Sequence, residues 1–386
     1  MTEYQLLIDL IREVVCENSK VHLRNNNELS DEQLHTLYKL AKAQDLAHIV
    51  GVSLQNALNE NTSQIKKFFT QAQIQAMYRY VNLTYELKQI CQVFEKNSIK
   101  HMPLKGAIIR DYYPSPELRT SCDIDILVPS DYLDSAIDCL VSECNYTFER
   151  RYSHDVSLFS PSKVHLELHF NLIENNEKIS NVLNNIWNTS TLDKDSNFRY
   201  IMSNEFFVVY HIAHMAEHFI HGGCGVRNFL DLWIAKNKMG FDEQLSNKML
   251  QECGLLEFST AVFQLVNVWF NDSEHNDITR EIESYVLSSG IYGTMENRVA
   301  ISQAETNGKA KYIFSRMFLP YSKLKCIYPK LEKHPILLPY YQVVRWVDFV
   351  FHKNKKRALL ELKYNKNVNQ EKKKRLKRMM DKLNLS

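Results

Sequence analysis

Strand-forming sequence is confined to one block of about 70 residues in this chain of 386, and helix-forming sequence precedes and follows it. Short apolar or alternating runs within the block are typical of strands. They cover Ile99–Leu104, Cys122–Val128, Tyr146–Tyr152, Val156–Phe159 and Val164–Phe170, and a helix is predicted over Gly106–Tyr112. This distribution favours an α+β fold in which a small mixed sheet is set between helical segments.

The flanking segments have helical periodicity and few chain breakers. Leu34, Leu37 and Leu40 recur at three-residue spacing, and Ser30 followed by Asp31 fits an N-cap with an acid in the first turn. Because 386 residues exceed what one hydrophobic core usually holds, we expect several packed units. These are an N-terminal helical segment (1–98), an α+β core (99–175), a C-terminal all-helical domain (176–350) and a basic helical tail (351–386).

Positive charge is concentrated in the tail, although the net charge of the chain is only +2. Residues 353–382 hold 13 Lys and Arg against 3 acids, a surplus of 10, so the rest of the chain carries about −8. The cations surround a narrow apolar stripe of Leu376, Met379, Met380 and Leu383. Such a helix fits RNA or an anionic membrane surface, and it equally fits a solvated face over a lightly buried stripe.

The chain contains no run of about 18 uncharged apolar residues, so we expect no transmembrane segment. Charged residues interrupt the first 20 positions, which argues against a signal peptide. The eight cysteines are scattered without a CxxC pair, and this favours neither a zinc knuckle nor a disulfide framework. We therefore expect a cytoplasmic protein.

The run Cys122–Val128 reads Cys-Asp-Ile-Asp-Ile-Leu-Val and is the most informative segment. On a strand, Asp123 and Asp125 point to the same face, about 7 Å apart at their Cα atoms. Glu167 lies on a later strand and offers a third carboxylate. Nucleotidyl transfer uses such carboxylates to hold divalent cations roughly 3.5 to 4 Å apart. We predict that Asp123, Asp125 and Glu167 are the metal ligands and catalytic residues, although an Asp-x-Asp pair can also be a solvent-facing strand end.

Upstream of this run lie residues suited to phosphate. Gly106 is expected at the start of a helix, where a bare backbone and free N–H groups let an anion approach closely. Lys105 adds a positive charge at that turn, and Arg110 and Arg119 are near enough in sequence to reach a triphosphate. These four residues are the predicted nucleotide contacts, and ordinary exposed side chains are the alternative for the three cations.

A histidine-rich helix follows the strand block. His211, His214, His218 and His221 share one face of the helix predicted over Val208–His221. His214 and His218 have the spacing of two zinc ligands. The alternative is that the histidines pack beside a nucleotide-binding cleft or lie on the surface without binding a metal. His214, His218, His169 and Arg227 are candidates for substrate contact. Arg227 and Asp231 are four residues apart, which predicts an ion pair between them.

Two segments carry a resemblance to a known group. LKGAIIRDYYPSPELRTSCDIDILV, followed by HLELHFNL, resembles a bacterial group labelled nucleotidyltransferase family protein, within the superfamily of DNA polymerase β-like nucleotidyltransferases. In that group an LKG turn replaces the more usual Gly-Ser, an Arg precedes the Asp-x-Asp strand, and Glu-x-His completes the set. The chain departs from the wider superfamily because Lys105-Gly106-Ala107 offers no hydroxyl to the phosphates.

The resemblance implies a Mg²⁺-dependent or Mn²⁺-dependent transferase that moves an NMP from an NTP to an acceptor. Two alternatives remain open from the sequence. One is a non-catalytic nucleotide-binding or scaffold module. The other is a toxin-like RNA nucleotidyltransferase, for which the basic tail is the only indication.

Overall fold

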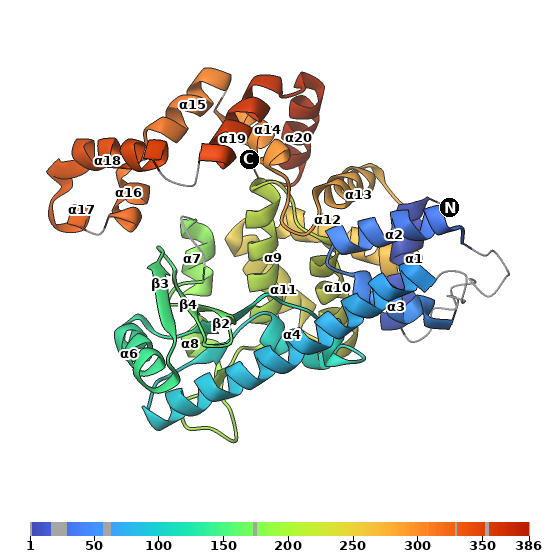
Figure 1. The fold of residues 1–386 in the computed structure, drawn as a ribbon, viewed down its shortest axis with the longest axis horizontal. Coiled ribbons are helices and arrows are strands. Elements are labelled where there is room, and N and C mark those ends of the chain that lie inside the picture. Colours follow the sequence, from blue (N-terminus) through green and yellow to red (C-terminus); the bar gives the residue numbers. More distant parts are fainter. Residues whose placement is uncertain are drawn as a thin grey trace.

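The computed structural model describes residues 2–16, 29–56, 63–172, 176–306, 308–328, 330–351 and 355–385. Residues 173–175 of the predicted core and 352–354 and 386 of the predicted tail lie outside the described residues. The small sheet lies toward one end of the molecule and the first three helices toward the other, and the long helix α4 runs between them (Figure 1).

Within residues 2–16, 29–56 and 63–98, the regular structure before the strands is helical. Ser30 Oγ accepts a hydrogen bond from the Gln33 amide, and the Ser30 amide donates to Gln33 Oε1, so the predicted N-cap is confirmed as a capping box. The elements are α1 (Glu3–Val15), α2 (Asp31–Ala43), α3 (Ala47–Ser53), η1 (Leu54–Asn56) and α4 (Ser63–Lys96).

The strand block folds as predicted into one five-stranded mixed sheet with the order β1-β2-β5-β4-β3. Strands β2 and β5 are parallel, and the other neighbours are antiparallel. Strand β1 is shorter than predicted because the Ile99 amide still donates to Phe94 O and closes α4. The elements are β1 (Met102–Pro103), α5 (Gly106–Ile109), η3 (Arg110–Tyr112), η4 (Pro116–Leu118), β2 (Asp123–Leu127), η5 (Ser130–Tyr132), α6 (Leu133–Cys144), β3 (Thr147–Arg151), β4 (Asp155–Phe159) and β5 (His165–His169).

After β5, the regular structure of the described residues is helical except for one two-stranded hairpin, which was not predicted from the sequence. No helix in the described part of the chain has the length and apolarity to cross a membrane. The elements are α7 (Glu177–Leu183), α8 (Ile186–Thr189), β6 (Thr191–Leu192), β7 (Tyr200–Ile201), α9 (Asn204–Ile220), α10 (Val226–Ile234), η6 (Ala235–Met239), α11 (Glu243–Cys253), α12 (Leu256–Phe270), α13 (Asp277–Ser289), α14 (Met295–Glu305), α15 (Lys309–Met317), α16 (Tyr321–Ile327), α17 (Lys330–Lys333), η7 (Pro335–Leu337), α18 (Leu338–Phe351), α19 (Lys355–Asn367) and α20 (Gln370–Lys382).

The buried apolar side chains of the described residues form two separate hydrophobic cores. The smaller core joins one face of the sheet to α6 and to the second half of α4, and it includes Ile126, Leu168 and Phe94. The larger core joins α1, α2 and α3 to the C-terminal helices, so segments far apart in sequence share one interior. Because apolar side chains occupy one face of the sheet, its other face is available for the polar residues of the site.

The tail belongs to the larger core. The stripe of Leu376, Met379, Met380 and Leu383 is buried where α20 contacts α13 and α14. Lys372 and Lys382 pair with Glu296 at 2.8 Å and Glu281 at 3.0 Å. The stripe is therefore buried and unavailable to RNA or lipid, as one of the two alternatives expected. Binding of RNA or an anionic surface by the cations of the tail stays a prediction. Lys374, Arg375, Lys377 and Arg378 remain exposed.

If α20 is an integral part of the core, Met379→Ala should lower the free energy of unfolding by about 2–5 kcal/mol, because a buried side chain leaves a cavity. Lys377→Ala, on the exposed face of the same helix, should change it by no more than about 0.5 kcal/mol. Urea unfolding measures both variants. Equal stabilities would contradict the packing of the tail.

Candidate active site

The parallel pairing of β2 with β5 builds the centre of the site. Asp125 lies directly opposite Glu167, and Asp123 lies opposite His165. Residues paired in this way point to the same face of a sheet, so the carboxylates converge while the intervening Ile and Leu side chains enter the smaller core. Ligand atoms of Asp123, His165 and Glu167 lie within 4.8 Å of one another, and so do those of Asp125, Glu167 and His169. Glu167 therefore has a ligand atom within 4.8 Å of one on Asp123 and of one on Asp125, on the shared face that the strand alternation predicted. Their role as metal ligands stays a prediction.

Two cations share one oxygen of Asp125. Lys105 Nζ donates to Asp125 Oδ1 at 2.8 Å, and His169 Nε2 lies 2.9 Å from the same oxygen. Burial alone would raise the pKa of Asp125, but the charge of Lys105 and the hydrogen bond from His169 hold it well below its ordinary value. Burial would likewise lower the pKa of His169, yet its bonds to Asp125 and Glu167 raise it to about 9. Both partners of Asp125 therefore carry positive charge at neutral pH.

This pairing changes the expected charge of the site. Without Lys105 and His169, three neighbouring carboxylates would repel an incoming triphosphate. Lys105, the predicted phosphate contact, here neutralises Asp125 with a side chain that is 18% exposed. Burial and the charges of Asp125 and Glu167 raise the pKa of Asp123 to about 6. The carboxylate cluster is therefore partly neutralised by the protein itself.

Donor groups surround the turn at Gly106. Lys105 adopts a positive φ of 44°, which few residues other than glycine adopt, and the chain then enters α5 at Gly106. A Cβ on Gly106 would lie 3.4 Å from Arg119 Nη1, 3.5 Å from Ser121 Oγ and 3.7 Å from Arg110 Nη2. The bare face of this glycine is thus bordered by two guanidinium groups and a hydroxyl, a set of donors suited to an anion.

A buried ion pair holds Arg119 in place. Its Nε and Nη2 atoms donate to Asp231 at 2.8 to 3.0 Å, and its Nη1 donates to Thr120 O at 2.7 Å. Tyr113 donates to the same carboxylate at 2.7 Å, and Asp231 is 0% exposed. The ion pair predicted between Arg227 and Asp231 is wrong, because Asp231 points into the core toward the strand block.

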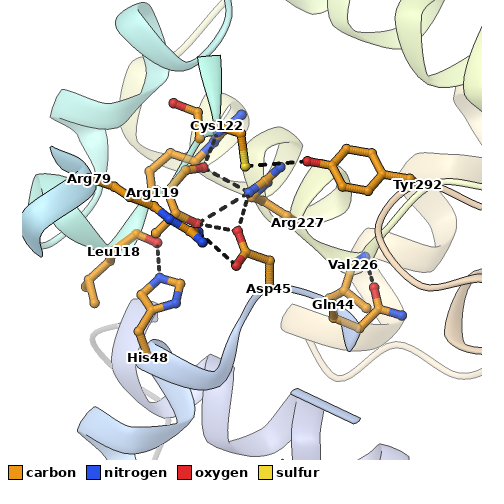
Figure 2. A network of polar contacts seen from close by, with 12 residues as sticks. Gln44, Asp45, His48, Arg79, Leu118, Arg119, Cys122, Val226, Arg227 and Tyr292 are labelled. Carbon is orange, nitrogen blue, oxygen red and sulfur yellow. Dashed lines mark hydrogen bonds and ion pairs between the residues drawn. The ribbon is translucent and has the colours of Figure 1, made fainter. Parts of the chain in front are cut away.

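Arg227 instead belongs to a second polar cluster, which we call the Asp45 junction and which consists of Asp45, Arg79, Thr120 and Arg227. Asp45 lies between α2 and α3 and accepts from Arg79 at 3.2 Å, Thr120 Oγ1 at 2.9 Å and Arg227 at 3.1 Å. Arg227 also donates to Thr120 O at 2.9 Å. Figure 2 shows this carboxylate between the two arginines. The junction ties the N-terminal helices and α10 to the loop before β2.

Two further bonds fix the same contact. Gln44 Oε1 accepts from the Val226 amide at 3.0 Å, and His48 Nε2 lies 2.9 Å from Leu118 O (Figure 2). Burial lowers the pKa of His48, so the ring is neutral and donates to this carbonyl. The loop that leads to Asp123 is therefore held from both helical parts of the chain.

The comparison with known families agrees with this geometry. A family model described as uncharacterised nucleotidyltransferase matches residues 30–271. The chain belongs to this nucleotidyltransferase family. A search of curated proteins found no match. The matched segment begins at the N-cap of α2 and extends past α12, so the nucleotidyltransferase segment contains both the carboxylates and the Asp45 junction.

The histidine helix of the nucleotidyltransferase, α9, faces this site. Burial and the charge of Lys105 lower the pKa of His218 to about 4, and the same two causes hold the pKa of His214 well below its ordinary value, so both rings are neutral. His211 is buried and lies 3.0 Å from Asn228 O, whereas His221 is exposed. Among the described residues, the clusters of three potential ligands involve the sheet rather than α9, which does not support the zinc alternative.

Tyr292 is a neighbour of the site that the sequence analysis missed. It lies between Gly290 and Gly293, which both have positive φ, and it is 65% exposed. Its hydroxyl lies 3.6 Å from Cys122 Sγ, one residue before Asp123 (Figure 2). Two glycines around an aromatic residue were the available signal. Asp45 gave no signal, because nothing local distinguishes it from other acidic residues, and for Asp231 the four-residue spacing indicated Arg227 rather than its partner Arg119.

Removing the partner of Arg119 tests the buried ion pair. Asp231→Asn should lower the free energy of unfolding by about 3–5 kcal/mol at pH 7, because Arg119 stays buried without a counter-charge. The pKa of Asp231 is lowered in the folded protein, since the charge of Arg119 outweighs burial. Its contribution is therefore present above the ordinary pKa of about 4 and is lost as pH falls further.

Urea unfolding at pH 7 and at acidic pH checks this expectation, with Asp131→Asn on the exposed turn η5 as the control. The difference between wild type and Asp231→Asn should narrow below pH about 4. A difference that persists unchanged at low pH, or none at pH 7, would contradict the assigned role of the ion pair.

Proposed function

We propose that the chain is a Mg²⁺-dependent or Mn²⁺-dependent nucleotidyltransferase that moves an NMP from an NTP to a hydroxyl or phosphate oxygen of an acceptor. The observation that carries this proposal is the parallel register of β2 and β5, which gathers three carboxylates beside the Gly106 turn. Carboxylate oxygens are the ligands that these hard cations prefer, and the cluster has the right donor type and spacing. Membership of the nucleotidyltransferase family supports the same reaction class.

Asp123, Asp125 and Glu167 would hold the metal. When bound, the cation would stabilise the charge on the attacking and leaving oxygens. The acceptor oxygen would attack the α-phosphorus, the bond to the β-phosphate oxygen would break, and pyrophosphate would leave. Glu167 has a side chain 29% exposed beside the buried Asp125, so we assign it the proton of the acceptor hydroxyl.

The cations around Gly106 would bind the triphosphate. Arg110 and Arg119 border the bare face of this glycine, and both are held by bonds within the protein. When the nucleotide binds, Lys105 would leave Asp125 and pair with a phosphate oxygen. The Asp125 carboxylate could then bind the metal. Because Asp231 fixes the orientation of Arg119, its guanidinium would be preorganised for the anion. Tyr292, Arg227, His214 and His218 lie around the cluster and would face the acceptor or the nucleoside.

One observation favours a second function. Asp125 Oδ1 already has two cationic partners, Lys105 and His169, which balance its charge. A protein that binds nucleotide without turnover would need no catalytic metal in addition to these two cations. In that case the chain would be a non-catalytic nucleotide-binding module. The two functions differ in whether any part of the NTP becomes attached to an acceptor.

Transfer of a phosphate label from the NTP distinguishes the nucleotidyltransferase from the non-catalytic binding module. Each of the four NTPs, labelled at the α- or the γ-phosphate, would be incubated with the protein, Mg²⁺ and cell extract. Nucleotidyl transfer predicts α-label on a small molecule, a protein or RNA, and no transfer of γ-label. Transfer of γ-label would contradict the proposed reaction, and absence of transfer in every fraction would support the binding module.

The matched variants are Asp123→Asn and, as control, Asp131→Asn. Asp123→Asn removes a carboxylate and leaves the Lys105–Asp125 pair intact, so the fold should survive while transfer falls at least about a hundred-fold. Asp125→Asn is less suitable because it leaves Lys105 and His169 buried beside a neutral group. Transfer that Asp123→Asn does not reduce would contradict the assigned metal site.

A further inference from the structure

Helix α4 has two apolar faces, and the described residues of the chain cover only one of them. On the inner face, Leu83, Ile90 and Phe94 are buried in the smaller core. The outer face carries a stripe of exposed apolar residues, which we call the α4 stripe: Ile74 at 57%, Met77 at 44%, Tyr78 at 67%, Val81 at 54% and Tyr85 at 61% exposed. A helix that is apolar all round is normally buried on every side.

The positions of these residues define one continuous surface. Spacings of three and four residues place all five on one side of the helix, over about three turns. The long helix lies along the edge of the molecule in Figure 1. A contiguous exposed apolar patch of this kind marks a surface that binds another molecule.

The few charged residues near the α4 stripe indicate which kind of molecule it could bind. Between Phe68 and Leu87 the only charged residues are Arg79 and Glu86. Arg79 is paired with Asp45, and Glu86 is 6% exposed and accepts from Tyr146 and Ser162. The stripe therefore lacks the cationic rim that an anionic lipid surface or RNA would require. It suits an uncharged apolar surface such as its own.

We propose that the α4 stripe is the contact of a symmetric dimer, in which the α4 helices of two copies pack antiparallel. The register that places Tyr78 opposite Val81 of the second copy also places Ile74 opposite Tyr85. It sets Lys88 opposite Gln71 and Lys67 opposite Gln92, so no like charges meet. A two-fold contact is self-complementary in this way, and dimers of this symmetry are the commonest oligomers.

The available area is sufficient. The five side chains expose on the order of 500 Å² per copy, so the contact would bury on the order of 1,000 Å² in total, the lower range of specific interfaces. Two tyrosines at the centre supply the large, rigid side chains that dominate the energy of such contacts. This proposal is independent of the reaction assigned above, because its test measures mass rather than turnover.

Sedimentation velocity over a range of protein concentrations tests the dimer. The wild type should sediment as a dimer, and Tyr78→Glu combined with Val81→Glu should weaken association on the order of a hundred-fold. Ile336→Glu removes an apolar residue that is 87% exposed elsewhere and should leave the dimer intact. Circular dichroism should be unchanged in both variants, since all three positions are exposed. A monomeric wild type, or a dimer that survives the double substitution, overturns the proposal.

Cross-linking tests the register. Under mild oxidation, Ile74→Cys combined with Tyr85→Cys should link two copies through their opposite positions, whereas Ile74→Cys alone should not exceed the wild-type background. That background matters because Cys122 is exposed. Equal linking by the single and the double variant would exclude the antiparallel register.

Discussion

The parallel pairing of β2 with β5 is the contact on which the site depends. Thirty-seven residues separate the two strands in the chain, and they form α6 and the antiparallel strands β3 and β4. Because side chains alternate along a strand, a shift of one residue in this register would turn Glu167 into the apolar core. The buried Ile124, Ile126, Leu166 and Leu168 oppose such a shift, so the hydrophobic core fixes the position of the carboxylates.

Buried ion pairs also fix the residues that surround the sheet. Lys105 and His169 balance Asp125, and Asp231 balances Arg119. Each pair would be costly to break because a lone buried charge is poorly solvated. Asp231 lies on α10, so its ion pair with Arg119 also orients α10 relative to the loop before β2. In the Asp45 junction, ion pairs likewise hold the N-terminal helices, but the charged groups there are less buried.

Local periodicity explains what could be predicted from sequence. The alternation in Cys122–Val128 and His165–His169 depends on neighbouring residues alone, and it located both strands and all three carboxylates. Pairings over long separations could not be predicted in this way. Arg119 meets Asp231 at a distance of 112 residues in the chain, and the nearer Arg227 was the wrong partner. The contact of Lys105 with Asp125 also depends on an unusual backbone angle that no residue pattern reveals.

We propose that Asp123, Asp125 and Glu167 form a metal site and that, without metal, the ammonium group of Lys105 balances the charge of Asp125. Titration of Mn²⁺, followed by the electron paramagnetic resonance of the free ion, tests it on wild type, Asp123→Asn and Lys105→Ala without nucleotide. Lys105→Ala should bind Mn²⁺ more tightly than wild type, because Asp125 loses a competing cation, and Asp123→Asn should bind it more weakly. Equal Mn²⁺ affinity in all three proteins would contradict this metal site.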